Sequence, residues 1–171
     1  MNLTGLTPDF AMRVGTLLAK LKAQGVEMRP YSTLRTPFEQ ASLWRQGRTS
    51  EQIGAMTARL RATGAPRIAA CIEAVGPQHG RKVTNAVPGY SWHQHGEAVD
   101  CFRVRNGEAD WDPVAYKDYA RVAREMDLKP GADFSDFPHV QLRHHEPQAH
   151  MTPAQIEIAL CERWPTFAAL K

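Results

Sequence analysis

The stretch SWHQHGEAVD, from Ser91 to Asp100, places two histidines, a glycine and two acids within ten residues. The residues after Gly96 alternate as a strand, and Asp100 would project from its inner face. His93 lies seven residues before Asp100, an odd spacing that would point the two side chains to opposite faces of an unbroken strand. They can converge only where the backbone bends, and Gly96 permits a bend. The sequence therefore predicts a turn that leads into a strand carrying Asp100.

Apolar residues recur at helical spacing on both sides of this stretch, and several of these segments open with Thr-Pro or Asp-Pro. Further strands are expected where short runs of the sequence alternate between apolar and polar residues. No βαβ rhythm is present, so we expect the α+β class, with a small, mainly antiparallel sheet flanked by several helices. The 171 residues fit a single domain, 1–171. The expected helices are 7–25, 36–47, 50–62 with Ser50 as cap, one after Pro66, 112–128 and 152–164; the expected strands are 26–35, 96–105 before a hairpin turn at Asn106-Gly107, 137–143 and a short one at Lys82–Thr84.

The net charge of +3 and the isoelectric point near 8.9 are only mildly basic. The basic residues are scattered and match no recognised binding motif, so no nucleic-acid partner is expected. No apolar run reaches the roughly 20 residues that a membrane-spanning helix needs, and no transmembrane segment is expected. The first fifteen residues lack a basic flank and an apolar block, so we expect no secretory signal and synthesis in the cytoplasm. We also expect a monomer.

A second group of candidate ligands lies in DFSDFPHVQLR, where His139 would stand on a short strand. Zinc requires three or four nitrogen, oxygen or sulfur ligands, so His139 is the best candidate to join His93 and Asp100. Asp136 precedes His139 by three residues and could act as a general base without being a ligand. Because Pro138 disfavours a helix here, the spacing of Asp136 and His139 indicates an extended or turned segment.

Three elements of the sequence resemble one family of enzymes. SWHQHGEAVD matches the pattern S-x-H-x-x-G-x-A-x-D of the zinc D-alanyl-D-alanine carboxypeptidases and L-alanyl-D-glutamate endopeptidases, which cut the stem peptides of peptidoglycan. DFPH matches the acid-x-x-H element of that family. YSTLRTPFEQASLWRQGR is similar to its segment R-[ST]-x-x-x-Q-x-x-L-[YW]-x-Q-G-R. The resemblance runs from about the first helix to Leu142.

The resemblance implies a role for each matched residue. The zinc ion would be held on the sheet by His93, Asp100 and His139. Asp136 would be the catalytic base. Arg35 would stabilise the developing oxyanion or hold a substrate carboxylate. Two further residues are expected on the substrate side. Gln40 would lie beside that arginine, and Ser91 opens the motif SWHQHGEAVD.

The WRQGR ending and the stretch RKVTNAVPGYSWH resemble phage endolysins most closely. We therefore expect hydrolysis of the L-alanyl-D-glutamate bond by a lysis protein, which would act on the bacterial cell wall after release through a membrane lesion. A D-alanyl-D-alanine carboxypeptidase is the alternative within the family. A binding module that keeps the fold and the metal but lacks catalysis is a second alternative. The segment Ser50–Gln78 looks longer than in a minimal member of the family.

Other residues leave further interpretations open. His95 could share a strand face with His93 and bind metal, although it fills a variable position of the motif, which favours a pocket-wall or solvent role. A cysteine hydrolase could use Cys101 with His139 and Asp136, yet strand alternation places Cys101 and Asp100 on opposite faces, so both cannot easily serve one pocket. Aromatic residues could line a substrate groove but are more often core. These are Tyr90, Trp92 and Trp111.

Overall fold

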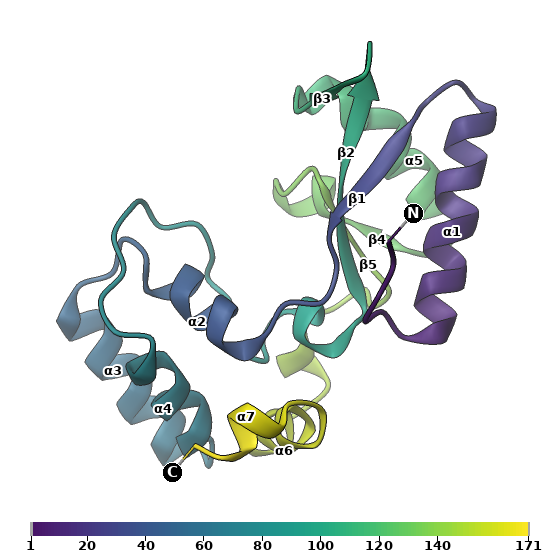
Figure 1. Ribbon diagram of the computed structural model, residues 1–171. Coiled ribbons are helices and arrows are strands. Elements are labelled where there is room, and N and C mark those ends of the chain that lie inside the picture. The colour runs from purple at the N-terminus through teal and green to yellow at the C-terminus, as the bar shows by residue number, and fades with distance from the viewer. Residues whose placement is uncertain (1, 171) are drawn as a thin grey trace. The chain divides into compact units, whose positions relative to one another are not determined.

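The protein is described by a computed structural model of residues 2–170 (Figure 1). The described residues form seven α-helices and one five-stranded sheet, which confirms the α+β class. The chain divides into two compact units, and we describe each by itself. Unit 1 contains the residues up to Leu34 and Gly96–His144, and unit 2 contains Arg35–His95 and the residues from His145 onward. The single domain expected from the chain length stays a prediction.

Unit 1 holds the antiparallel sheet. The strand order is β1-β2-β5-β4, and β3 pairs with the C-terminal end of β2. The hairpin between β2 and β3 turns at Asn106-Gly107, where both residues have positive φ, as the sequence predicted. The strands are β1 (Met28–Ser32), β2 (Ala98–Arg105), β3 (Glu108–Asp110), β4 (Lys129–Pro130) and β5 (His139–Gln141); the helices of the unit are α1 (Pro8–Ala23) and α5 (Lys117–Glu125), with short 3-10 turns η2 (Pro113–Tyr116) and η3 (Gly131–Phe134).

One face of this sheet packs on the helices, and the other carries the candidate ligands. Val99, Cys101 and Val140 belong to the same apolar core as the buried faces of α1 and α5, which lie beside the sheet in Figure 1. Side chains alternate along a strand, so Asp100 and His139 lie on the opposite face. The core therefore supports the two strands from behind and leaves their other face for chemistry.

Unit 2 is helical and has its own apolar core. Three of its helices begin with Thr-Pro or Thr-Ser, and each threonine forms a capping box with the glutamate or glutamine three residues later. The cap of the third helix is Thr49, not Ser50 as expected, because the Thr49 side chain accepts from the Gln52 amide. The helices are α2 (Pro37–Arg45), α3 (Ser50–Ala62), α4 (Pro66–Ala74), α6 (Pro153–Arg163) and α7 (Pro165–Ala168), with 3-10 turns η1 (Trp92–His95) and η4 (Pro147–Ala149).

Two further expectations were wrong. Lys82–Thr84 forms no strand, since the Thr84 carbonyl accepts from the Arg48 side chain at 2.7 Å and its hydroxyl from the Ala86 amide at 3.1 Å. The helix expected over 112–128 begins as the 3-10 turn η2, which Asp112 caps, and becomes α-helical only at Lys117. Within residues 2–170 we find no helix with the length and apolar character to span a bilayer.

Candidate metal centre

Asp100 and His139 lie directly opposite each other on the paired strands β2 and β5. His139 Nδ1 is 3.1 Å from Asp100 Oδ1, and each residue is only 6% exposed. Burial alone would lower the pKa of His139, but the hydrogen bond to Asp100 and the negative charges of Asp100 and Asp136 raise it above its ordinary value. This part of the sheet therefore favours a positive charge at the imidazole, whether a proton or a metal ion supplies it.

His93 lies on η1, immediately before the bend into β2. η1 is a 3-10 turn, so the idea that His93 and His95 share a strand face is wrong. Gly96 bends the backbone with a φ of +73°, as expected. One ligand atom each from His93, Asp100 and His139 lies within 4.8 Å of the others, and all three residues are buried. The motif predicted these three residues as metal ligands, and that assignment stays a prediction.

Two imidazoles and one carboxylate form a donor set that suits zinc and leaves a coordination position open. The fit rests on burial as well as on donor type. His93 is 2% exposed, so all three residues that could ligate a metal are largely removed from solvent. Buried acids and histidines are costly unless paired or bound to a metal. His93, Asp100 and His139 therefore form a group that could hold a metal ion.

Asp136 stands on the turn between η3 and β5. Its amide donates to the Gly131 carbonyl at 2.9 Å, and its own carbonyl accepts from the His139 amide at 3.0 Å. The spacing of Asp136 and His139 is thus built by a turn, as the intervening Pro138 predicted. Asp136 is exposed to solvent, whereas His139 is buried. An exposed carboxylate on the turn that leads to a buried imidazole is suited to accept a proton at the edge of the site.

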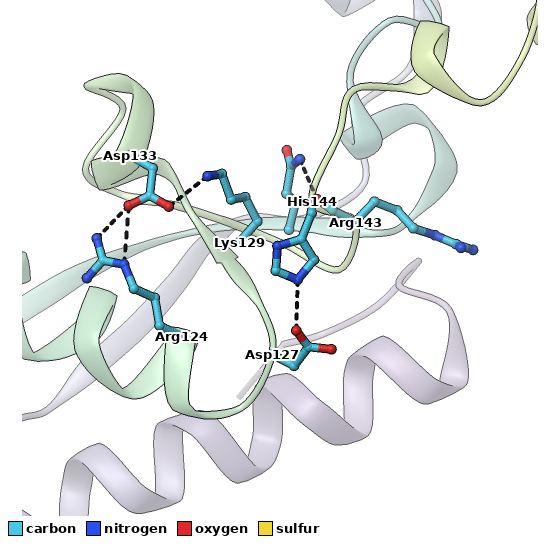
Figure 2. Close-up of polar contacts among 7 residues, drawn as sticks. Arg124, Asp127, Lys129, Asp133, Arg143 and His144 are labelled. Atoms are coloured by element: carbon cyan, nitrogen blue, oxygen red, sulfur yellow. Dashed lines mark hydrogen bonds and ion pairs between the residues drawn. The ribbon is translucent and has the colours of Figure 1, made fainter.

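Ion pairs fix the segment that leads into this turn (Figure 2). Asp133 on η3 accepts from Arg124 at 2.5 Å and from Lys129 at 2.7 Å. Hydrogen bonds to Lys129 and Arg124 lower the pKa of Asp133. They join η3 to the end of α5 and to β4, so the turn that bears Asp136 starts from a fixed point.

In unit 2, a buried amide network holds Arg35. Gln40 Oε1 accepts from Arg35 at 3.0 Å and from Gln94 Nε2 at 3.2 Å, and Gln40 Nε2 donates to the Ala86 carbonyl at 2.7 Å. Gln40 and Gln94 are both fully buried. The sequence prediction that Gln40 lies beside Arg35 is confirmed. Because three hydrogen bonds fix the Gln40 amide, its contacts favour the orientation of Arg35 over direct binding of substrate.

The remaining motif residues have varied surroundings. Ser91 contributes its carbonyl to a hydrogen bond from the Gln94 amide, and its expected place on the substrate side stays a prediction. His95 Nε2 lies 2.9 Å from the Gly89 carbonyl, and its ring lies against Trp92. His95 thus makes contacts within unit 2, and the pocket-wall or solvent role expected from the sequence stays a prediction. Cys101 is buried, and burial raises the pKa of its thiol to about 12.

The three aromatic residues named from the sequence divide between core and surface. Trp92 is buried and donates to the His145 carbonyl at 2.8 Å, and Tyr90 packs against the core of unit 2. Trp111 is 51% exposed and lies edge-on to Tyr31, with ring centroids 5.2 Å apart. The expectation that such residues are core holds for Trp92 and is wrong for Trp111.

The QGR segment, Gln46–Arg48 at the end of WRQGR, makes contacts within unit 2. Arg48 donates to the carbonyls of Trp44 and Thr84, and its guanidinium lies 4.1 Å from the Trp44 ring centroid. Gly47 has a φ of +66°, and a side chain there would collide with the backbone of Lys82. These contacts hold the loop after α2 against residues 82–84, so this segment stabilises the unit.

Two buried glutamines were not predicted from the sequence. Gln94 occupies a variable position of the histidine motif, and Gln141 lies two residues after His139 on β5. Strand alternation places Gln141 on the same face as His139, and this signal was available in HVQ. No comparable signal existed for Gln94, because its partners come from distant parts of the sequence.

The sequence profile of the VanY family, described as D-alanyl-D-alanine carboxypeptidase, matches residues 4–127, which is most of the chain. This range includes Arg35, His93 and Asp100 and ends before the turn that carries Asp136 and His139. No curated protein matches the sequence.

Proposed function

Since the chain belongs to the D-alanyl-D-alanine carboxypeptidase (VanY) family, and is thus a hydrolase of the peptidase class, we propose that it is a zinc-dependent enzyme that cuts the stem peptides of peptidoglycan. The observation that carries the zinc proposal is the buried group of His93, Asp100 and His139. The family match supports peptidoglycan as the substrate. The donor set supports zinc over calcium or magnesium, because these two ions prefer ligand shells made of oxygen atoms.

An amide is a poor electrophile, so its hydrolysis needs an activated water and a stabilised oxyanion. Zinc, when bound, would supply the Lewis acidity for both tasks. His93, Asp100 and His139 would hold the ion. Asp136 is proposed to take a proton from the attacking water through its carboxylate and to pass it to the leaving amine. Its exposed position on the η3–β5 turn supports this role, because a carboxylate there can reach a water molecule at the edge of the site.

Arg35 is proposed to supply a fixed positive charge to the oxyanion or to a substrate carboxylate. Gln40 would hold its guanidinium in place through the 3.0 Å hydrogen bond. A preorganised donor to an oxyanion contributes roughly 3 kcal/mol to transition-state stabilisation. Ser91 is proposed to contact the substrate.

Two scissile bonds are candidates. The resemblance of the motifs to endolysins supports the L-alanyl-D-glutamate bond, and we retain it as the proposed target of a monomeric lysis protein that reaches the wall through a membrane lesion. The family description favours the second candidate, the terminal D-alanyl-D-alanine bond. The QGR residues that suggested the endopeptidase make contacts within unit 2, so the bond must be decided by assay.

The test uses purified peptidoglycan and mass spectrometry of the released fragments. Cleavage at L-alanyl-D-glutamate frees a peptide that begins with D-glutamate, whereas carboxypeptidase action frees only D-alanine. We expect His93→Ala to lose both zinc and activity. Asp136→Asn, which keeps the shape of the side chain, should retain zinc and lose activity by about 100-fold or more.

An active Asp136→Asn variant would remove Asp136 as the base. Full activity after removal of metal with a chelator would remove the zinc mechanism. A wild-type protein that binds zinc and releases no fragment would favour the non-catalytic binding module of the same fold.

A further inference from the structure

Gln141 contacts a candidate metal ligand and has no role in the mechanism above. It lies on β5, on the same sheet face as His139, and is 2% exposed. Its Oε1 is 2.9 Å from His139 Nε2, and its Nε2 is 2.7 Å from the Arg143 carbonyl oxygen. The imidazole of His139 therefore lies between Gln141 on one side and Asp100 on the other, where Nδ1 is 3.1 Å from the carboxylate.

These contacts determine which way the glutamine amide points. A backbone carbonyl can only accept a hydrogen bond, so the nitrogen of the Gln141 amide must be the atom that faces Arg143. The oxygen of the amide then faces His139. An amide oxygen also can only accept, so Nε2 of His139 must carry a proton and donate it.

An imidazole that donates from Nε2 can offer a lone pair to a metal ion only from Nδ1. Nδ1 is the nitrogen that faces Asp100, the other candidate ligand on the sheet. We propose that Gln141 is a positioning residue that fixes the tautomer and the ring orientation of His139, so that Nδ1 is the atom that binds the metal. This inference rests on the zinc site of the proposed function.

The acceptor of the Gln141 amide is itself held in place. Arg143 forms an ion pair with Glu97 at 2.8 Å, and the Leu142 amide donates to the Glu97 carbonyl at 2.9 Å. Glu97 directly precedes β2, which carries Asp100. The chain of contacts thus runs from Asp100 on β2 through β5 to the residue just before β2. The amide of Gln141 has no alternative orientation that keeps both of its hydrogen bonds.

The test compares the zinc affinity of two variants by competition with a chromophoric chelator. Gln141→Met keeps the length of the side chain and removes the acceptor, and we expect zinc to bind about 10- to 100-fold more weakly. Gln141→Glu keeps an acceptor for Nε2–H, and we expect it to recover most of the affinity. Unchanged affinity in Gln141→Met, or an equal loss in both variants, would overturn the proposal.

A second measurement needs no variant. Long-range proton–nitrogen correlation spectra of the zinc-loaded protein, with His139→Gln used to assign the signals, should show Nε2 of His139 protonated and Nδ1 bound to metal. The reverse assignment would overturn the proposal even if Gln141→Met failed to fold. A wild-type protein that binds no zinc would instead refute the proposed function, so the two failures are distinguishable.

Discussion

Gly131 lies close against the backbone of Asp136, on the turn that leads to His139. A Cβ atom there would overlap the Asp136 carbonyl oxygen and lie 2.7 Å from the His139 Cβ. The turn that places the proposed base and ligand can form only because this position has no side chain. The missing side chain of Gly131 therefore helps to determine the geometry of the site.

We predict that Gly131→Ala costs about 1–3 kcal/mol in the free energy of unfolding, as other overpacked sites do, and also weakens zinc binding. Urea denaturation and chelator competition would measure the two effects. Gly15→Ala is the matched control, since Gly15 lies in α1 with no atom within 4 Å of the added carbon. The control should stabilise the protein by about 0.5–1 kcal/mol. A Gly131→Ala variant as stable as wild type would contradict this view of the turn.

The cysteine hydrolase considered from the sequence would need Cys101 as its nucleophile, whereas the zinc mechanism does not use this residue. Burial raises the pKa of this thiol to about 12, so almost no thiolate exists near neutral pH, and the side chain points into the core. Cys101→Ala should therefore keep peptidase activity within a few-fold of wild type, with a loss of about 1–2 kcal/mol in stability from the lost contacts. Abolished hydrolysis in a folded, zinc-loaded Cys101→Ala protein would revive the alternative.

At the scale of elements, η3 is held to α5 and β4 by the ion pairs of Asp133. The pKa of Asp133 is lowered in the folded state, so folding favours the charged carboxylate. Its contribution to stability is fully present above the ordinary value of 3.8 and is lost as the pH falls through the lowered folded-state pKa.

The corresponding prediction concerns Asp133→Asn. At neutral pH the variant should be less stable than wild type by on the order of 1 kcal/mol, because partly exposed ion pairs are weak. The difference should shrink between neutral pH and a pH well below 3.8, as the pH falls through the lowered folded-state pKa of Asp133, because a protonated carboxyl group carries no more charge than an amide. Urea unfolding at the two pH values measures it. A difference that persists at low pH would show that the asparagine perturbs packing and not charge.

The elements also show what the sequence could predict. Thr-Pro starts and apolar spacing placed α1, α2 and α6 well, since capping and periodicity are local properties. The sequence could not reveal that the carbonyl of Thr84 would be taken by Arg48, a contact between residues 36 positions apart that removes a possible strand. The buried amide of Gln94 was hidden for the same reason, since its partner Gln40 lies 54 positions away in the sequence. Long-range hydrogen bonds leave no periodic trace in a sequence.

The candidate metal site was predictable to a greater extent. The motif predicted His93, Asp100 and His139 as one group, and the structure brings their ligand atoms together. The bend at Gly96 was expected from the odd spacing, and it is present. Gln141 lies outside the residues that match the motif, although strand alternation places it on the same face as His139.

At the scale of the whole molecule, each unit has its own apolar core, and a bound ion would add to the stability of the folded chain. A ligand that binds only the folded state stabilises it by about 2.7 kcal/mol when its free concentration is 100 times Kd. We expect the thermal midpoint of the protein to rise on addition of zinc and to fall with a chelator. His139→Ala should show no such shift. A thermal midpoint of the wild type that does not change on addition of zinc would contradict the expected stabilisation by the bound ion.

The central claim is that two imidazoles and one carboxylate gather around a single zinc ion. Elemental analysis after dialysis against a zinc-buffered solution tests it most directly, on wild type and on variants of each ligand, with Asp136→Asn as the control that should keep its metal. We predict one zinc per chain in the wild type and the control, and strong loss in His93→Ala, Asp100→Ala and His139→Ala. A wild-type protein without zinc, or ligand variants that retain a full equivalent, would contradict the account.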